Sequence, residues 1–180
     1  MWGFFVYLWA QHNPFLMQIL THRQIEQKTR RLAIEIFENN YREEEIILAG
    51  INNNGMSFAE MLMNALLELT DKKITLTRIR LNPANPVANE ILLEMPVEDV
   101  KDKVLIIVDD VANTGRTIFY AFKPVFGTLP KKVEVAVLVN RTHKSFPVKV
   151  DYCGLSLATT LKDNIDVKIR EVEDFGVFLN

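Results

Sequence analysis

An apolar run that ends in two aspartates is the feature that most constrains the fold of this 180-residue chain. Residues 104–108 read VLIIV, and Asp109 and Asp110 follow directly. A continuous apolar run of this length is typical of a central parallel strand that is covered on both faces. Similar strands are predicted at residues 46–51, 74–81 and 133–139, and amphipathic helices at residues 21–40, 57–69 and 117–126. This alternation predicts an α/β fold with a mostly parallel central sheet and helices on both faces.

Local signals set the expected boundaries of these elements. Thr21 with Gln24, and Ser57 with Glu60, have the spacing of a capping box at a helix start. Residues 52–55 (NNNG) and residues 82–89, which contain two prolines, are predicted loops. From Asn140 the pattern becomes irregular, which predicts a small irregular hood, mainly residues 140–165. Two short β-like pieces, DVKIREV and GVFL, close the chain.

The segment from Asp109 to Thr117 combines two opposite chemistries. Open α/β sheets bind ligands at the carboxyl ends of their strands, and a carboxylate pair there suits Mg²⁺ or the hydroxyls of a sugar. The following turn instead suits a phosphate, because it brings hydroxyls, a glycine, an arginine and a helix start. Together they predict a ribose 5-phosphate site; the alternative is a solvated aspartate pair before a helix-capping threonine. The residues of the turn are Ala112, Asn113, Thr114, Gly115, Arg116 and Thr117.

The stretch VLIIVDDVANTGRTI resembles the phosphoribosyl-pyrophosphate (PRPP) motif of the type I phosphoribosyltransferases. Within that family the similarity is greatest to the PyrR group, which combines pyrimidine-operon attenuation with uracil phosphoribosyltransferase activity. The segments VAVLVNRTHKSFPVKVDYCG and EVEDFGVFLN are also similar to that group, so the resemblance extends over about residues 19–180. It implies transfer of the 5-phosphoribosyl group from PRPP to a nucleobase, most simply uracil, with Mg²⁺ as cofactor and a homodimer as the assembly.

The resemblance also implies roles for individual residues. Asp109 and Asp110 would hold the ribose hydroxyls, and through the ribose the Mg²⁺, as catalytic residues. Residues 112–117 would bind the 5-phosphate, residues 82–89 would be the flexible loop, and residues 140–160 would hold the base. The expected pyrophosphate loop is Ile51, Asn52, Asn53, Asn54 and Gly55, and the expected base-holding residues are Arg141, His143 and Leu155.

Three segments depart from the family pattern. The pyrophosphate loop has three asparagines where PyrR-like chains have basic residues, and residues 82–85 read NPAN in place of a Tyr-Arg-Asp-Asp run. GLSLATT also differs from the corresponding segment of the hood. Arg78 and Arg80 precede the flexible loop on one face of the predicted strand, so they could act together, one of them could supply the missing cation, or both could be irrelevant; Arg80 is the candidate catalytic residue.

Two other functions have partial support in the sequence. GINNNGMS is similar to a nucleotide-binding P-loop, but Met56 stands where that motif requires lysine. The second is an RNA-binding, nucleotide-sensing regulator, based on Arg141, His143, Lys144 and Lys149, with Lys131 and Lys132 nearby. A net charge of −2 and a pI of about 6.0 favour a solvated loop over an RNA site.

Residues 1–16 differ in composition from the rest, since they contain both tryptophans. We expect either an extension outside the single domain at residues 17–180, or a hydrophobic strap on the domain or on a partner subunit. Their apolar part is too short to cross a membrane and lacks the features of a signal peptide. With one cysteine, Cys153, the sequence predicts a cytoplasmic protein.

Overall fold

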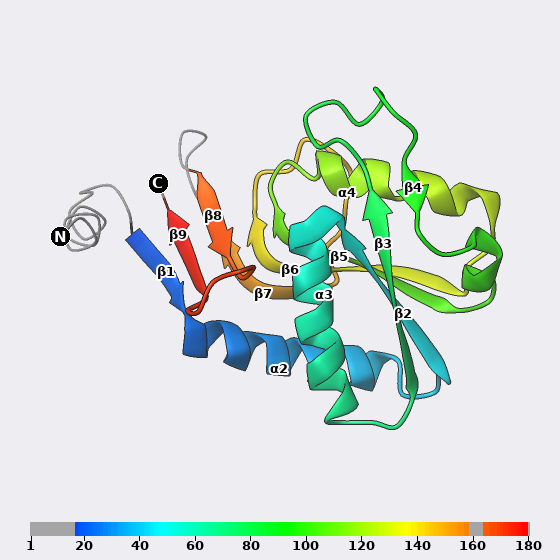
Figure 1. Ribbon diagram of the computed structural model, residues 1–180, viewed down its shortest axis with the longest axis horizontal. Coiled ribbons are helices and arrows are strands. Elements are labelled where there is room, and N and C mark those ends of the chain that lie inside the picture. Colours follow the sequence, from blue (N-terminus) through cyan, green and yellow to red (C-terminus); the bar gives the residue numbers. More distant parts are fainter. Residues whose placement is uncertain (1–16, 159–163, 180) are drawn as a thin grey trace.

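The computed structural model describes residues 17–158 and 164–179, which form two sheets of unequal size. The larger has six strands in the order β4-β3-β2-β5-β6-β7 (Figure 1). Five of them run parallel, and only β4 pairs antiparallel, with β3. The strands are β2 (Glu45–Ile51), β3 (Lys73–Arg80), β4 (Leu92–Leu93), β5 (Val104–Ala112), β6 (Lys132–Arg141) and β7 (Tyr152–Leu157). The predicted α/β class with a mostly parallel sheet is confirmed.

Two hydrophobic cores lie on opposite faces of this sheet, because side chains alternate along each strand. One contains Ile46, Leu48 and Ile106 and is covered by α2 (His22–Asn39) and α3 (Asn52–Leu67). The other contains Ile47 and Ile107 and is covered by α4 (Arg116–Ala121) and the 3-10 helices η1 (Val97–Val100) and η2 (Lys123–Gly127). Helices therefore cover both faces, as the apolar run in β5 predicts.

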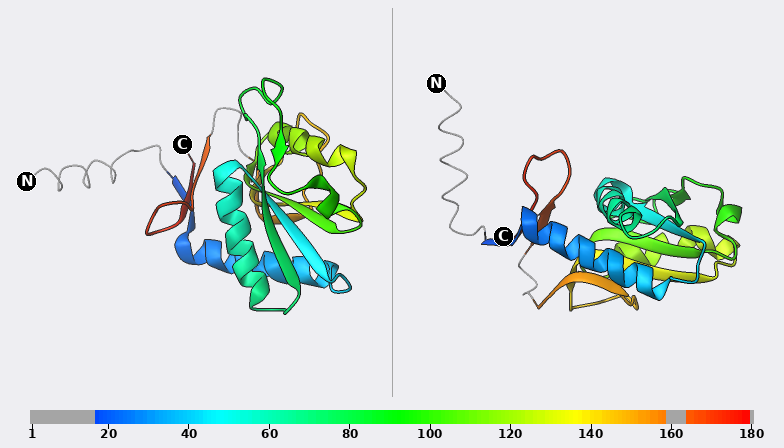
Figure 2. Two further views of the ribbon diagram at one scale, coloured as in Figure 1. Left: turned by 45° about the vertical axis from the view of Figure 1, so that its right-hand side comes forward. Right: turned by 90° about the horizontal axis from the view of Figure 1, so that it is seen from below.

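The smaller sheet joins the two ends of the described chain. It has the order β1-β9-β8 and consists of β1 (Met17–Thr21), β8 (Ile165–Lys168) and β9 (Gly176–Leu179), all antiparallel. It stands beside the start of α2, at one end of the larger sheet (Figures 1 and 2). Sequence reasoning anticipated β8 and β9 as short strands, but it did not find β1.

The prediction of an irregular segment after Asn140 is wrong for residues 152–157. These residues form β7, which extends the main sheet by parallel pairing with β6. Tyr152 is buried at their start, and its hydroxyl donates to a Glu134 oxygen at 2.9 Å. The strand was missed because its polar and small residues, YCGLSL, lack a strong alternating pattern. Of the expected hood, residues 159–163 lie outside the described residues, as does the predicted extension at residues 1–16.

Two helix predictions also need correction. The helix predicted at residues 57–69 starts five residues earlier, at Asn52, so Ser57 and Glu60 do not form a cap. The predicted helix at residues 117–126 divides into α4 and η2, because Pro124 lacks the N–H that a continuous helix would use. The capping box of Thr21 and Gln24 is confirmed, with both reciprocal bonds present at the start of α2.

Candidate functional site

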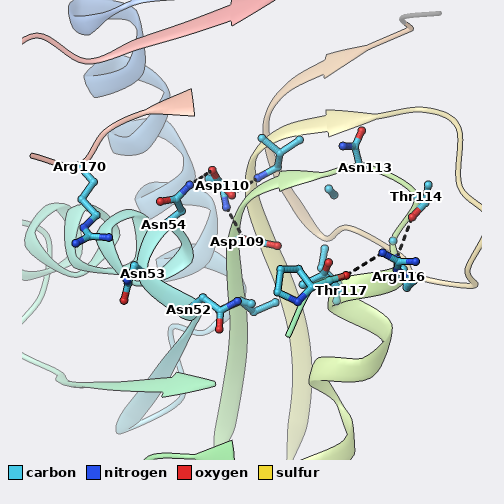
Figure 3. Close-up of a pocket in the computed structure, with 16 residues that line it drawn as sticks. Asn52, Asn53, Asn54, Asp109, Asp110, Asn113, Thr114, Arg116, Thr117 and Arg170 are labelled. Atoms are coloured by element: carbon cyan, nitrogen blue, oxygen red, sulfur yellow. Dashed lines mark hydrogen bonds between the residues drawn. The ribbon is translucent and has the colours of Figure 1, made fainter. Parts of the chain in front are cut away.

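A cavity of about 390 Å³ lies at the carboxyl ends of β2 and β5 (Figure 3). It is the position at which open α/β sheets bind their ligands. Two of the predicted groups meet there, the aspartate pair with the turn after it and the residues from Ile51 to Asn54. Pro83 of the predicted flexible loop and Arg170 complete the lining. The full lining is Ile51, Asn52, Asn53, Asn54, Pro83, Asp109, Asp110, Val111, Ala112, Asn113, Thr114, Gly115, Arg116, Thr117, Ile118 and Arg170.

The two aspartates have different surroundings. Asp109 is only 7% exposed, and burial, together with the neighbouring charge of Asp110, raises its pKa well above the ordinary value for an aspartate. Asp110 is half-buried, and its carboxylate accepts a hydrogen bond from the side-chain amide of Asn54 at 3.0 Å. A cation or a pair of sugar hydroxyls at this position would favour the ionised form of both carboxylates. The pair is therefore suited to a ligand that brings positive charge or hydrogen-bond donors.

The turn after β5 adopts the conformation that its glycine permits. Gly115 has φ of +84°, in the left-handed region that side chains with a Cβ avoid. Thr114 accepts a hydrogen bond from the Arg116 N–H at 3.4 Å through its hydroxyl, and the Arg116 guanidinium donates to the Pro83 carbonyl at 2.8 Å. The turn is thus joined to the predicted flexible loop on one side of the cavity.

A second segment braces this turn from outside the cavity. The Lys144 ammonium donates to the carbonyls of Ala112 at 2.9 Å and of Asn113 at 3.0 Å, and also to the Asn140 side chain and the Arg141 carbonyl. Burial lowers the pKa of Lys144. The Thr114 carbonyl accepts from the N–H groups of residues 145 and 146 at 3.0 and 3.1 Å. Lys144, which sequence reasoning considered only as part of a basic cluster, is therefore a structural anchor of residues 112–117, the predicted phosphate-binding segment, which we call the phosphate turn.

Of the residues predicted as a pyrophosphate loop, Ile51 ends β2 and residues 52–55 form the first turn of α3, so the prediction of a loop at residues 52–55 is wrong. The helix can begin here because Gly55 packs directly on β5: a Cβ at Gly55 would lie 2.5 Å from the Val108 carbonyl oxygen. Asparagine and glycine are poor helix formers, but tertiary contacts override that preference. The first N–H groups of a helix have no intrahelical acceptor, and this helix start carries a partial positive charge.

Asn52 and Asn53 each use the side-chain oxygen in a hydrogen bond within the protein. The side-chain oxygen of Asn52 accepts from the Leu81 N–H at 3.1 Å, and that of Asn53 accepts from the Arg78 guanidinium at 3.3 Å. The amide NH₂ groups of these two residues remain as hydrogen-bond donors. Asn52 and Asn53 carry no charge, but they can therefore offer hydrogen-bond donors to a ligand.

Other predicted site residues lie outside the main cavity. Arg80 forms an ion pair with Glu94, and it lines a neighbouring cavity of about 370 Å³ together with Arg78. Among the described residues that line the main cavity, none is Arg141, His143 or Leu155. Arg141 contacts the edge of the cavity, because its guanidinium donates to the Asn113 side chain at 2.7 Å. His143 is exposed. Leu155, in β7, packs against the core that α2 and α3 cover. Three lining residues, Val111, Ile118 and Arg170, were not assigned a role from the sequence.

Comparison with known proteins shows the family of this chain. The family described as phosphoribosyl transferase domain matches residues 16–171. The chain belongs to this phosphoribosyltransferase family. The bifunctional protein PyrR of Clostridium acetobutylicum is 30% identical over 167 residues, covering 87% of this chain and 92% of that protein. PyrR of Clostridium novyi is 34% identical over 165 residues, covering 86% and 91%.

Solved structures of phosphoribosyltransferases share the fold. The hypoxanthine phosphoribosyltransferase of Trypanosoma cruzi superposes with a TM-score of 0.72 at 18% identity, covering 89% of this chain and 94% of that one. A hypoxanthine-guanine phosphoribosyltransferase of Bacillus anthracis gives 0.65 at 18% identity, covering 78% and 81%. The resemblance to the type I phosphoribosyltransferases and to PyrR is thereby confirmed. No helix in the described ranges 17–158 and 164–179 has the length and apolar character needed to cross a membrane.

The chemistry of the cavity is compatible with Mg²⁺. The described residues contain no cluster of three or more histidine, cysteine or acidic side chains that would form a complete metal site. Mg²⁺ bound through one or two carboxylates and the phosphates of a substrate needs no such cluster. Asp109 and Asp110, beside a cavity lined by donors, fit a metal ion that arrives with a phosphorylated ligand.

Proposed function

We propose that this protein transfers the 5-phosphoribosyl group from PRPP to uracil and releases pyrophosphate. One observation carries the proposal: the aspartate pair, the phosphate turn and the donor-rich start of α3 line a single cavity. These three groups match the diol, the 5-phosphate and the diphosphate of one PRPP molecule. A role in the cytoplasm, as part of a homodimer, is the corresponding proposal for location and assembly.

Binding of PRPP would use each group for a different part of the ligand. The carboxylates of Asp109 and Asp110 would accept hydrogen bonds from the ribose hydroxyls, which favours their ionised state. The backbone N–H groups and hydroxyls of residues 112–117 would surround the 5-phosphate. Lys144 fixes the carbonyls of Ala112 and Asn113, so the turn needs little reorganisation when the phosphate arrives.

The reaction is a displacement at the anomeric carbon. A ring nitrogen of uracil forms a bond to that carbon and its proton passes to the solvent, while the bond to the pyrophosphate oxygen breaks and its electron pair leaves with pyrophosphate. Mg²⁺, when bound, neutralises part of the charge of the diphosphate. The protein contributes orientation, electrostatic stabilisation and a site that limits access of water.

Arg80 can contribute only by changing its partner. In this structure its guanidinium is held by Glu94, in the cavity next to the one that contains the aspartate pair. An exposed ion pair of this kind is weak, at about 0–1 kcal/mol, so a diphosphate could replace the carboxylate. We therefore keep Arg80 as a candidate catalytic residue that acts after this exchange.

A panel of nucleobases tests the proposal. Each base is mixed with PRPP, Mg²⁺ and the protein, and release of pyrophosphate is measured. Uracil should give turnover, and the Asp110→Asn variant should lose it. Turnover with a purine and not with uracil would refute the acceptor, and PRPP binding without turnover on any base would refute the catalytic function.

The alternative function is an RNA-binding regulator, which the similarity to bifunctional PyrR proteins supports. The structure leaves less of this basic cluster available to RNA, because the Lys144 ammonium is held by carbonyls of the phosphate turn and Lys149 pairs with Asp151 at 2.7 Å. Lys131 and Lys132 pair with Glu43 and Glu134. RNA binding that weakens steeply with salt would support the regulator, and no binding at low salt would exclude it.

A further inference from the structure

The cavity has one positively charged side chain whose role the sequence pattern does not explain. Of its described lining residues, two are cationic, Arg116 and Arg170. Arg116 belongs to the phosphate turn. Arg170 lies on the side of Asn53 and Asn54, across the cavity from Arg116 and Thr114 (Figure 3). The two cations therefore flank the aspartate pair from opposite sides.

The fold places Arg170 at the cavity although it is 60 residues beyond Asp110 in sequence. It follows β8, and the alternate residues Ile165, Val167 and Ile169 are at most 8% exposed in the hydrophobic core. With that face of the segment anchored, Arg170 projects away from the core. Its neighbour Glu171 has φ of +54°, an uncommon conformation for a residue with a Cβ, and the chain turns there.

The present partner of Arg170 would release it easily. Its guanidinium contacts the carboxylate of Glu171, and the side chains are 43% and 76% exposed. Exposed ion pairs contribute little to stability. A diphosphate is a better partner, because it carries more charge and its oxygens match the two parallel N–H groups of a guanidinium.

The side of the cavity that Arg170 faces already has the character of an anion site. The amide NH₂ groups of Asn52 and Asn53 are left as donors, since Leu81 and Arg78 occupy their oxygens. The start of α3 adds unpaired N–H groups. These groups carry no formal charge. Among the described residues that line this side of the cavity, Arg170 is the one that is positively charged.

We propose that Arg170 binds the diphosphate of PRPP and the pyrophosphate that leaves, and so replaces the cation that residues 52–54 lack. The inference rests on the proposed function, because it assigns the diphosphate to the asparagine side of the same cavity. Ribose 5-phosphate has no diphosphate, so its binding does not involve Arg170.

Calorimetry with three ligands tests this role. PRPP, pyrophosphate and ribose 5-phosphate, each with Mg²⁺, are titrated into the wild-type chain and into Arg170→Gln and Arg170→Lys. Arg170→Gln should weaken binding of PRPP and pyrophosphate by about 10- to 100-fold, the effect of one charge-assisted contact, and leave ribose 5-phosphate unchanged. Arg170→Lys should recover part of the loss. Glu171→Gln should strengthen pyrophosphate binding by up to about fivefold, because it removes the competing carboxylate.

Lys168→Gln is the matched control. Lys168 lies two residues earlier, is 49% exposed and pairs with Asp166 outside the cavity, so all three affinities should stay at the wild-type values. Unchanged PRPP and pyrophosphate affinity in Arg170→Gln would overturn the role of Arg170 and leave the proposed function intact. A wild-type chain that binds neither PRPP nor ribose 5-phosphate would overturn the proposed function itself.

Discussion

The most informative perturbation of this structure is Lys144→Met. Methionine has a similar length and fits an apolar stem, but it cannot donate a hydrogen bond. The substitution therefore removes the bonds from the ammonium to the carbonyls of Ala112 and Asn113, which lie at 2.9 and 3.0 Å. Those carbonyls belong to the phosphate turn, so both stability and phosphate binding should change.

The expected loss of stability is about 2 kcal/mol. Hydrogen bonds from a charged donor contribute about 1.5–3 kcal/mol each, and two bonds to the turn at the lower value give about 3 kcal/mol. The ammonium is only partly buried, so competition from water offsets part of that gain. In a domain of this size, about 2 kcal/mol corresponds to about 4–8 °C in Tm.

The effect on ligand binding should be smaller but specific. The N–H groups of residues 145 and 146 still hold the Thr114 carbonyl, so the turn keeps one of its anchors. We expect about tenfold weaker binding of ribose 5-phosphate, or about 1.4 kcal/mol. Thermal unfolding measures the first effect and calorimetry the second.

Lys149→Met is the control for Lys144→Met. The Lys149 side chain is 84% exposed and pairs with Asp151, so its replacement should change neither Tm nor affinity. Lys144→Met with the Tm of the wild-type protein and unchanged affinity for ribose 5-phosphate would refute the idea that Lys144 preorganises the turn.

Three further predictions concern other charged or polar groups. Asp110→Asn should greatly weaken PRPP binding while the fold is kept, because the ribose hydroxyls lose a charged acceptor; calorimetry and circular dichroism measure the two properties. Thr117→Ala should weaken ribose 5-phosphate binding by about 1 kcal/mol, the value of one lost hydrogen bond, again by calorimetry. Burial opposes ionisation of Glu45, but contacts with Thr75, Lys103 and Lys73 outweigh it and lower its pKa to about 2. The stability from Glu45 should therefore be complete above pH 4.5 and be lost as the pH falls towards 2, and Glu45→Gln should remove this part of the acid dependence in urea titrations.

Each of these three predictions has a result that would contradict it. Wild-type PRPP affinity in Asp110→Asn would refute binding of the ribose hydroxyls by Asp110. Wild-type ribose 5-phosphate affinity in Thr117→Ala would count against phosphate binding at residues 112–117. An identical slope of stability between pH 2 and 4.5 in Glu45→Gln would show that the contacts of Glu45 do not stabilise the fold. None of the three outcomes can be mistaken for general unfolding, since stability is measured in parallel.

Sequence reasoning was most successful where chemistry and structure are local. The apolar run before Asp109 predicted the central strand β5, and residues 109–117 came from one continuous segment, so their grouping needed no knowledge of the fold. The capping box at Thr21 is equally local. It failed at residues 52–55, where helix formation depends on contact between Gly55 and the Val108 carbonyl, and at residues 152–157, where pairing with β6 makes the strand.

The sequence by itself determined the α/β class and the grouping of the aspartate pair with the glycine-containing turn after it, because both depend on periodicity and on neighbouring residues. Only the tertiary structure decided which other residues surround residues 109–117. It brought the start of α3 to Asp110 through Asn54, closed Lys144 onto the phosphate turn, and placed Arg170 on the asparagine side of the cavity. These contacts join residues far apart in the chain, and only the packing of β8, α3 and β5 around one core fixes the distances between them.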